Sequence, residues 1–113
     1  MIIEVAPEFE KCLKKLAKKY ASIIKTDFIA FLAELEENPM LGDQIFENCR
    51  KARMAISSKG KGKSGGARII FYYEIIEEHI TLLYMYDKSD MENVRNDFIV
   101  QILKDYYNEK LGE

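Results

Sequence analysis

Histidine, cysteine and tryptophan are scarce in this sequence. Its 113 residues include one His, two Cys and no Trp. These few residues cannot supply the complete ligand set of a structural zinc site built from Cys and His. Two cysteines without an export signal favour reduced thiols, so Cys12 and Cys49 are expected to be free.

Long apolar runs and a secretory leader are also lacking. No apolar run approaches the ~20 residues that a membrane-spanning helix needs. The first residues, MIIEVAPEFEKC, have neither a basic start nor the long apolar core of a signal peptide. With 48 % hydrophobic and 32 % charged residues, the composition predicts one globular domain over residues 1–113, cytoplasmic and without a membrane partner.

Acidic residues are absent from one basic segment. The whole chain has 17 Lys+Arg and 19 Asp+Glu, yet residues 50–68 contain seven cations and no acid. Positive charge concentrated on an otherwise acidic chain indicates a surface that binds a polyanion. A solvated basic loop is the alternative interpretation. The seven cations are Arg50, Lys51, Arg53, Lys59, Lys61, Lys63 and Arg68.

The first half of the chain has helical spacing after one short strand. Residues 2–5 predict the strand, and a helical face follows at Phe9, Leu13, Leu16, Tyr20 and Ile23. Thr26 is the expected N-cap of a second helix, which Asn38-Pro39 ends because the residue before proline disfavours helix. Residues 40–47 are expected to form a loop.

The second half has strand-like alternation and then a last helix. Residues 49–58, 68–76 and 79–86 predict three strands, which must be antiparallel neighbours because their connections are short. Ser89 and Glu92 form a capping box for the helix, whose expected buried face is Val94, Phe98, Ile102 and Tyr106. The predicted order is β-α-α-β-β-β-α, an α+β fold with a small antiparallel sheet and helices on one face.

The basic segment is predicted to form a phosphate-binding hairpin. Paired strands lie about 5 Å apart, so Arg53 and Arg68 can converge on one ligand. Arg gives planar bidentate contacts to phosphate, and Lys gives a mobile point charge. For each of Tyr72, Tyr84 and Tyr86, core packing is the favoured interpretation, and a surface for base stacking is the alternative.

Residues 48–94 also carry a family resemblance. The stretch KARMAISSKGKGKSGGARIIFYY, followed by ITLLYMYDKSDMENV, resembles the HigB-type branch of the RelE/ParE toxin superfamily. The resemblance implies a RelE-like fold and a type II toxin that cleaves mRNA in the ribosomal A site. It further implies a cognate antitoxin, often of the helix-turn-helix type, with ribosome and mRNA as the other partners, and no metal or other cofactor.

The resemblance also implies roles for single residues. Arg68 matches the arginine that contacts phosphate, Lys51 and Arg53 match a basic pair, and Lys88 matches a basic position after the next strand. We expect Arg53 and Arg68 to stabilise charge, and Lys51 to be the candidate general acid or base. The remaining expected RNA contacts are Arg50, Lys59, Lys61, Lys63 and Tyr86.

One departure from the family pattern concerns proton transfer. Relatives place a Tyr or His in the stretch that matches Met91–Asn96, which here contains neither. Tyr86, Tyr106 and Tyr107 are the candidate substitutes, whereas His79 is expected at a solvated turn. Two other functions stay open: a ParE-like inhibitor of DNA gyrase, and a toxin relative that binds RNA without cleaving it.

Overall fold

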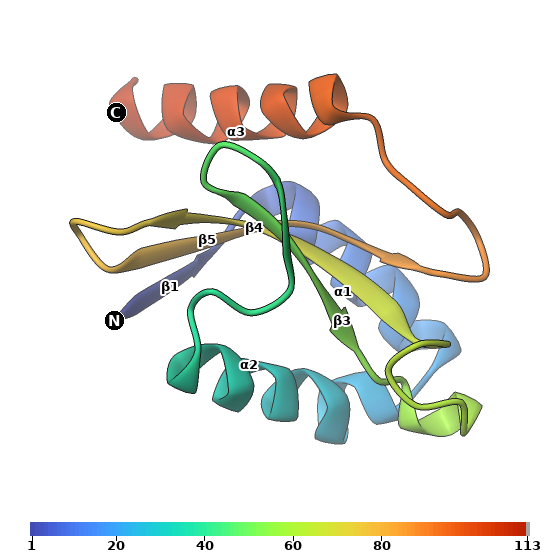
Figure 1. The fold of residues 1–113 in the computed structure, drawn as a ribbon. Helices are drawn as coiled ribbons and strands as arrows, with labels where there is room; N and C mark the ends of the chain where they lie inside the picture. Colours follow the sequence, from blue (N-terminus) through green and yellow to red (C-terminus); the bar gives the residue numbers. More distant parts are fainter. Residues whose placement is uncertain (113) are drawn as a thin grey trace.

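The order of helices and strands is close to the predicted one (Figure 1). The computed structural model describes residues 1–112. Its main helices are α1 (Pro7–Lys19), α2 (Phe28–Glu37) and α3 (Asn96–Leu111). Its strands are β1 (Ile2–Val5), β2 (Asp43–Phe46), β3 (Cys49–Met54), β4 (Ala67–Glu74) and β5 (His79–Asp87).

The five strands form one mixed sheet in the order β1-β5-β4-β3-β2. Strands β2 to β5 pair antiparallel, as predicted for β3, β4 and β5. The prediction of a purely antiparallel sheet is wrong for β1, which pairs parallel with β5 and places Ile2 opposite His79. Most of the chain separates these two strands, and so long a connection permits a parallel pair.

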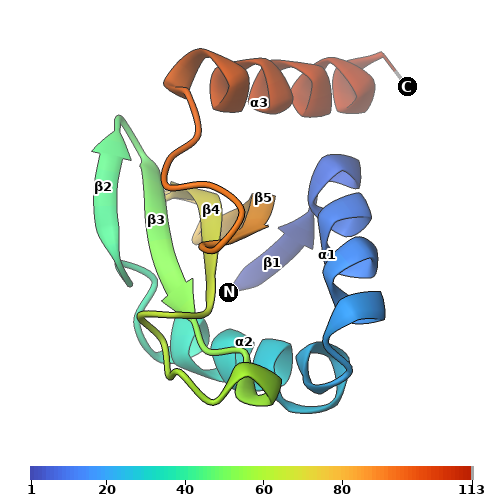
Figure 2. The same cartoon turned by 90° about the vertical axis from the view of Figure 1, so that its right-hand side faces the viewer.

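The helices cover both faces of the sheet, and the prediction of helices on one face is therefore wrong. Helices α1 and α2 pack on one face, and α3 packs on the other (Figures 1 and 2). Each face of the sheet has its own core: the first core lies under α1 and α2, and the second core lies under α3. Strand β4 contributes to both, because Ile69 belongs to the first core and Ile70 to the second. A strand that is apolar on both sides needs cover on both faces.

The segment predicted as a loop, residues 40–47, contains the edge strand β2. It pairs with β3 through a turn in which Asn48 has φ 61°. Ile45 and Phe46 are half-buried against the second core, which holds the strand in place. Before it, Gly42 has φ +79°, and an added Cβ would lie 2.2 Å from the carbonyl oxygen of Lys51, so this close approach requires glycine.

Helix α1 follows its predicted phase, because Phe9 and Leu16 are buried, and Ile23 continues the buried face after the helix has ended. The start of α2 differs from the prediction. A π-helical turn, η1 (Ile23–Asp27), leads directly into it, and Thr26 is no N-cap. Continuous helical backbone up to α2 leaves no break at which Thr26 can cap.

Helix α3 starts later than predicted. It begins at Asn96, after an extended Arg95, so Ser89 and Glu92 do not cap it. The Ser89 hydroxyl instead accepts a hydrogen bond from Lys59. The buried face is Ile99, Ile102 and Tyr106, while the predicted Phe98 is 41 % exposed. Within residues 1–112, no helix combines the length and apolar character that a bilayer crossing requires.

Candidate functional site

A hollow of about 520 Å³ lies beside β3 and β4, which carry most of its basic residues. We call it the cation hollow. Strand β3 and the neighbouring turn form one wall, and the segment between β5 and α3 forms another. Its lining residues are Leu41, Gly42, Asp43, Lys51, Arg53, Lys63, Arg68, Lys88, Glu92 and Asn93.

The predicted convergence of Arg53 and Arg68 is confirmed. The two residues are direct partners across β3 and β4, and both line the cation hollow. Side chains of directly paired residues lie on the same face of a sheet. Burial, and then the nearby charge of Arg53, lower the pKa of the Arg68 guanidinium. Two cations held side by side in this way form a site for an anion.

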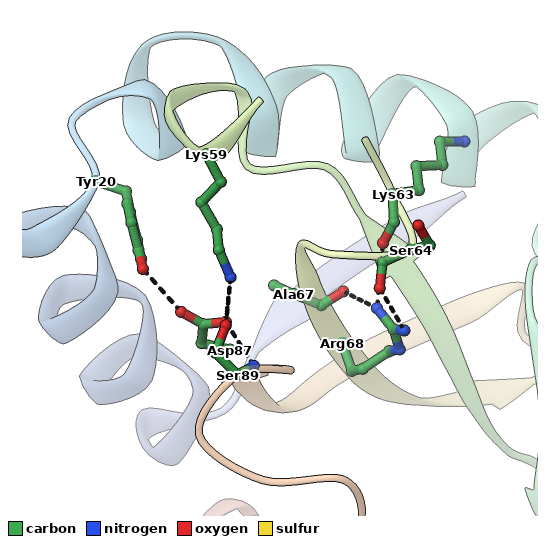
Figure 3. Close-up of polar contacts among 8 residues, drawn as sticks. All are labelled: Tyr20, Lys59, Lys63, Ser64, Ala67, Arg68, Asp87 and Ser89. Carbon is green, nitrogen blue, oxygen red and sulfur yellow. Dashed lines mark hydrogen bonds and ion pairs between the residues drawn. The ribbon is translucent and has the colours of Figure 1, made fainter. Parts of the chain in front are cut away.

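Arg68 is bound to its own loop on one side. Nη1 donates to the carbonyl oxygens of Lys63 and Ala67, both at 3.2 Å, and Nη2 donates to that of Ser64 at 3.1 Å (Figure 3). A guanidinium has five N–H donors. Arg68 is 6 % exposed, and within residues 1–112 its Nε and one N–H of Nη2 make no hydrogen bond. Arg68 therefore holds the glycine-rich loop between β3 and β4 in place, and it also lines the hollow.

Lys51 reaches across the hollow to the segment before α3. Its Nζ donates to Asn93 Oδ1 at 2.9 Å. Asp43 is paired with Lys51 across β2 and β3, so a carboxylate lies on the same side of the sheet. The Tyr86 hydroxyl donates to the carbonyl oxygen of Glu92 at 3.2 Å, which fastens this segment to β5.

The hollow has a surplus of positive charge. Five cations line it, against the carboxylates of Asp43 and Glu92. Lys88 and Arg53 are exposed, and in the described part of the chain neither takes part in an ion pair. Unneutralised cations around a concave surface attract a polyanion such as a nucleic-acid backbone.

Arg50 does not contribute to the cation hollow, contrary to the prediction. Its Nε donates to the carbonyl oxygen of Leu41 at 3.1 Å, and its Nη2 donates to that of Gly42 at 2.6 Å. Successive side chains of a strand point to opposite faces, so Arg50 lies on the other side of β3 from Lys51. It holds the turn before β2.

Lys59 is also unavailable to RNA, which corrects a second prediction. Its Nζ lies 2.7 Å from Asp87 Oδ1, and the two side chains are 9 % and 0 % exposed. Burial alone would raise the pKa of Asp87, but hydrogen bonds from Lys59, Ser89 and Tyr20 bring it down to about 2. Figure 3 shows these contacts among Tyr20, Lys59, Asp87 and Ser89, here called the Asp87 junction. The junction joins the end of α1, the loop before β4 and the end of β5.

Tyr86 is 3 % exposed, so the prediction that it stacks on bases is wrong. It is the cross-strand partner of Arg68 and positions the segment that carries Glu92. Lys63 does line the hollow, but its Nζ also lies 2.7 Å from Glu34. Lys61 lines an adjacent, smaller hollow together with Lys88.

The other candidates for proton transfer lie elsewhere. The Tyr106 hydroxyl donates to Glu4 on β1, and Tyr107 packs edge-on against Tyr72. His79 is not a solvated turn residue: its side chain is 19 % exposed and its Nε2 lies 3.5 Å from Glu4. None of these residues lines the cation hollow, as far as residues 1–112 describe it.

Three polar residues that line the hollow were not predicted to belong to the site: Asp43, Glu92 and Asn93. Asp43 was assigned to a loop and the other two to the first turn of the last helix, so their meeting depends on tertiary structure. Both cysteines are free, and burial raises the pKa of the Cys49 thiol to about 12, which leaves it unreactive. A scan of protein-family models finds none that matches the chain.

Proposed function

We propose that the protein is a type II toxin of the RelE/ParE superfamily, HigB-type branch, with a RelE-like fold. In this proposal it is a ribosome-dependent endoribonuclease that cleaves mRNA, and a cognate antitoxin holds it inactive. The observation that carries the proposal is the cation hollow, where Arg53 and Arg68 lie side by side and five cations face two carboxylates.

The proposed reaction is an in-line attack within the RNA. The 2′-oxygen bonds to the adjacent phosphorus, the bond from phosphorus to the 5′-oxygen breaks, and a 2′,3′-cyclic phosphate and a 5′-hydroxyl result. Negative charge develops on the non-bridging oxygens. Arg53 and the free Nε and Nη2 donors of Arg68 stabilise that charge, and preorganised donors of this kind supply a large share of catalysis.

Proton transfer falls to groups that line the hollow. Lys51 is the candidate acid or base, because its Nζ is held at a fixed place by Asn93. Asp43, its cross-strand partner, adds a carboxylate that can accept the proton of the 2′-hydroxyl. Lys88 supplies a further charge at the rim.

A second candidate function is RNA binding without cleavage. Two observations favour it: neither Tyr nor His is among the residues of 1–112 that line the hollow, and Arg68 donates three of its hydrogen bonds to its own loop and strand. A protein with these features still binds phosphate through charge, but lacks the family's usual proton donor.

A translation extract programmed with a defined mRNA tests the proposal. We expect cleavage within codons that depends on ribosomes, products with 2′,3′-cyclic phosphate and 5′-hydroxyl ends, and loss of cleavage in Arg53→Ala. Binding of mRNA without cleavage would support the second candidate. Breaks in DNA that depend on gyrase, with intact mRNA, would refute both and point to the ParE-like alternative.

A further inference from the structure

A second basic hollow lies next to the cation hollow. It has a volume of about 380 Å³ and is lined by Lys61, Ser64, Gly65, Lys88 and Ser89. None of these five residues is acidic. Lys88 lines both hollows, so the two sites are contiguous.

The walls of this second hollow are tied to the fold. The backbone N–H of Lys88 donates to the carbonyl oxygen of Gly66 at 3.1 Å, which joins the end of β5 to the glycine-rich loop. Lys59 holds the Ser89 hydroxyl at 2.7 Å, and Arg68 engages the carbonyl oxygen of Ser64. The backbone of this loop is thus held on both sides of the second hollow.

The position of Lys61 depends on a glycine. A Cβ added at Gly65 would lie 2.6 Å from Cβ of Lys61 and 3.1 Å from its Cδ. The aliphatic stem of Lys61 therefore lies directly over Gly65, where any other residue would displace it. This packing holds the Lys61 side chain at the second hollow.

The cations here differ from the other lysines of the loop. Lys59 and Lys63 each have a carboxylate at 2.7 Å, whereas Lys61 and Lys88 take part in no ion pair within residues 1–112. Two free ammonium groups beside the Ser64 hydroxyl are donors suited to a phosphate.

We propose that the second hollow binds a neighbouring phosphate of the strand whose scissile phosphate occupies the cation hollow. This inference rests on the proposed function and names its substrate more closely: a single-stranded RNA held by successive phosphates, with Lys88 between them. Affinity then depends on strand length and on salt, because each neutralised phosphate releases counterions.

The test measures binding of a labelled, non-cleavable 2′-O-methyl RNA hexamer by fluorescence anisotropy over a series of KCl concentrations. For single strands, each phosphate contact contributes about 0.7 to the slope of log affinity against log salt. Lys61→Gln is expected to lower that slope by about 0.7. Lys104→Gln, an exposed lysine of α3 that lines neither hollow, is the matched control.

Two further variants separate the possible failures. Gly65→Ala keeps every charge but displaces Lys61, so it should weaken binding in the same direction as Lys61→Gln. Equal slopes for Lys61→Gln and Lys104→Gln would overturn the second subsite, while a lower slope in Arg53→Gln would keep the proposed function. Unchanged binding in Arg53→Gln would contradict the proposed function and this inference together.

Discussion

The cation hollow and the Asp87 junction use the same residue types for opposite purposes. At the junction, Lys59 has a buried carboxylate partner and joins three segments of the fold. In the hollow, Arg53 lies beside another cation and is exposed. The difference is the presence of a partner: a neutralised cation serves stability, and an unneutralised one is left for a ligand. Sequence alone places both residues in one basic segment.

The largest expected effect concerns the junction. Asp87→Ala would leave the Lys59 ammonium buried without its partner, so we expect a loss of about 3–5 kcal/mol in the free energy of unfolding. Urea denaturation followed by circular dichroism measures it. Asp90→Ala, an exposed acid three residues on, is the control. A loss below about 1 kcal/mol would show that the junction is solvated like a surface pair.

The next effect concerns the hollow. Arg53→Ala should lower the rate of mRNA cleavage by about 10²–10³-fold, the usual cost of removing one preorganised charge-stabilising group. Its unfolding free energy should stay near that of the parent, because Arg53 is exposed. Arg95→Ala, which removes an exposed arginine whose ion pair in the described part of the chain is with Asp97, is the control. Equal rates in both variants would remove Arg53 from the site.

Low pH should weaken the Asp87 junction. The folded pKa of Asp87 is about 2, below the ordinary value of 3.8, so its stabilisation is fully present above about pH 4. That stabilisation, on the order of 2 kcal/mol, is lost as pH falls toward 2. Unfolding measured between pH 5 and pH 2 checks this: Asp87→Asn should lose less stability than the parent over that range. An identical acid dependence would count against the low pKa.

The smallest effect is at Lys63, which belongs to both regions. Its partner Glu34 is 39 % exposed, so Glu34→Gln should change stability by less than about 1 kcal/mol. The same change releases Lys63 toward the hollow, and RNA affinity should rise a few-fold at low salt. Glu36→Gln, an exposed neighbour on α2, is the control for net charge. Equal affinity in both variants would mean that Lys63 is not at the binding surface.

Sequence patterns predict the local structure of this chain, but they do not predict contacts between residues that are far apart in the sequence. The pairing of Arg53 with Arg68 was predictable because a short connection forces a hairpin. The burial of Lys59 was not, because its partner Asp87 lies 28 positions away and its place follows from tertiary packing. The placement of α3 failed for a similar reason, since Ser89 satisfies the capping pattern but is held by Lys59 instead.

The site itself was predicted in outline and corrected in detail. Lys51, Arg53, Arg68 and Lys88 do meet in one hollow. Arg50 does not, because neighbouring residues of a strand point to opposite faces and Arg50 directly precedes Lys51. This alternation could have been used on the sequence alone. Tyr86 was assigned to stacking, and only the structure reveals that it fastens the segment carrying Glu92.

The parallel pairing of β1 with β5 has a consequence for biosynthesis. The N-terminus leaves the ribosome first, yet Ile2 on β1 pairs with His79 on β5. The first strand must therefore wait until residues 79–82 have left the exit tunnel, while α1 and α2 can already form. The arginine pair also waits for β4, so a nascent chain that is interrupted before Ala67 carries neither a completed sheet nor its anion site.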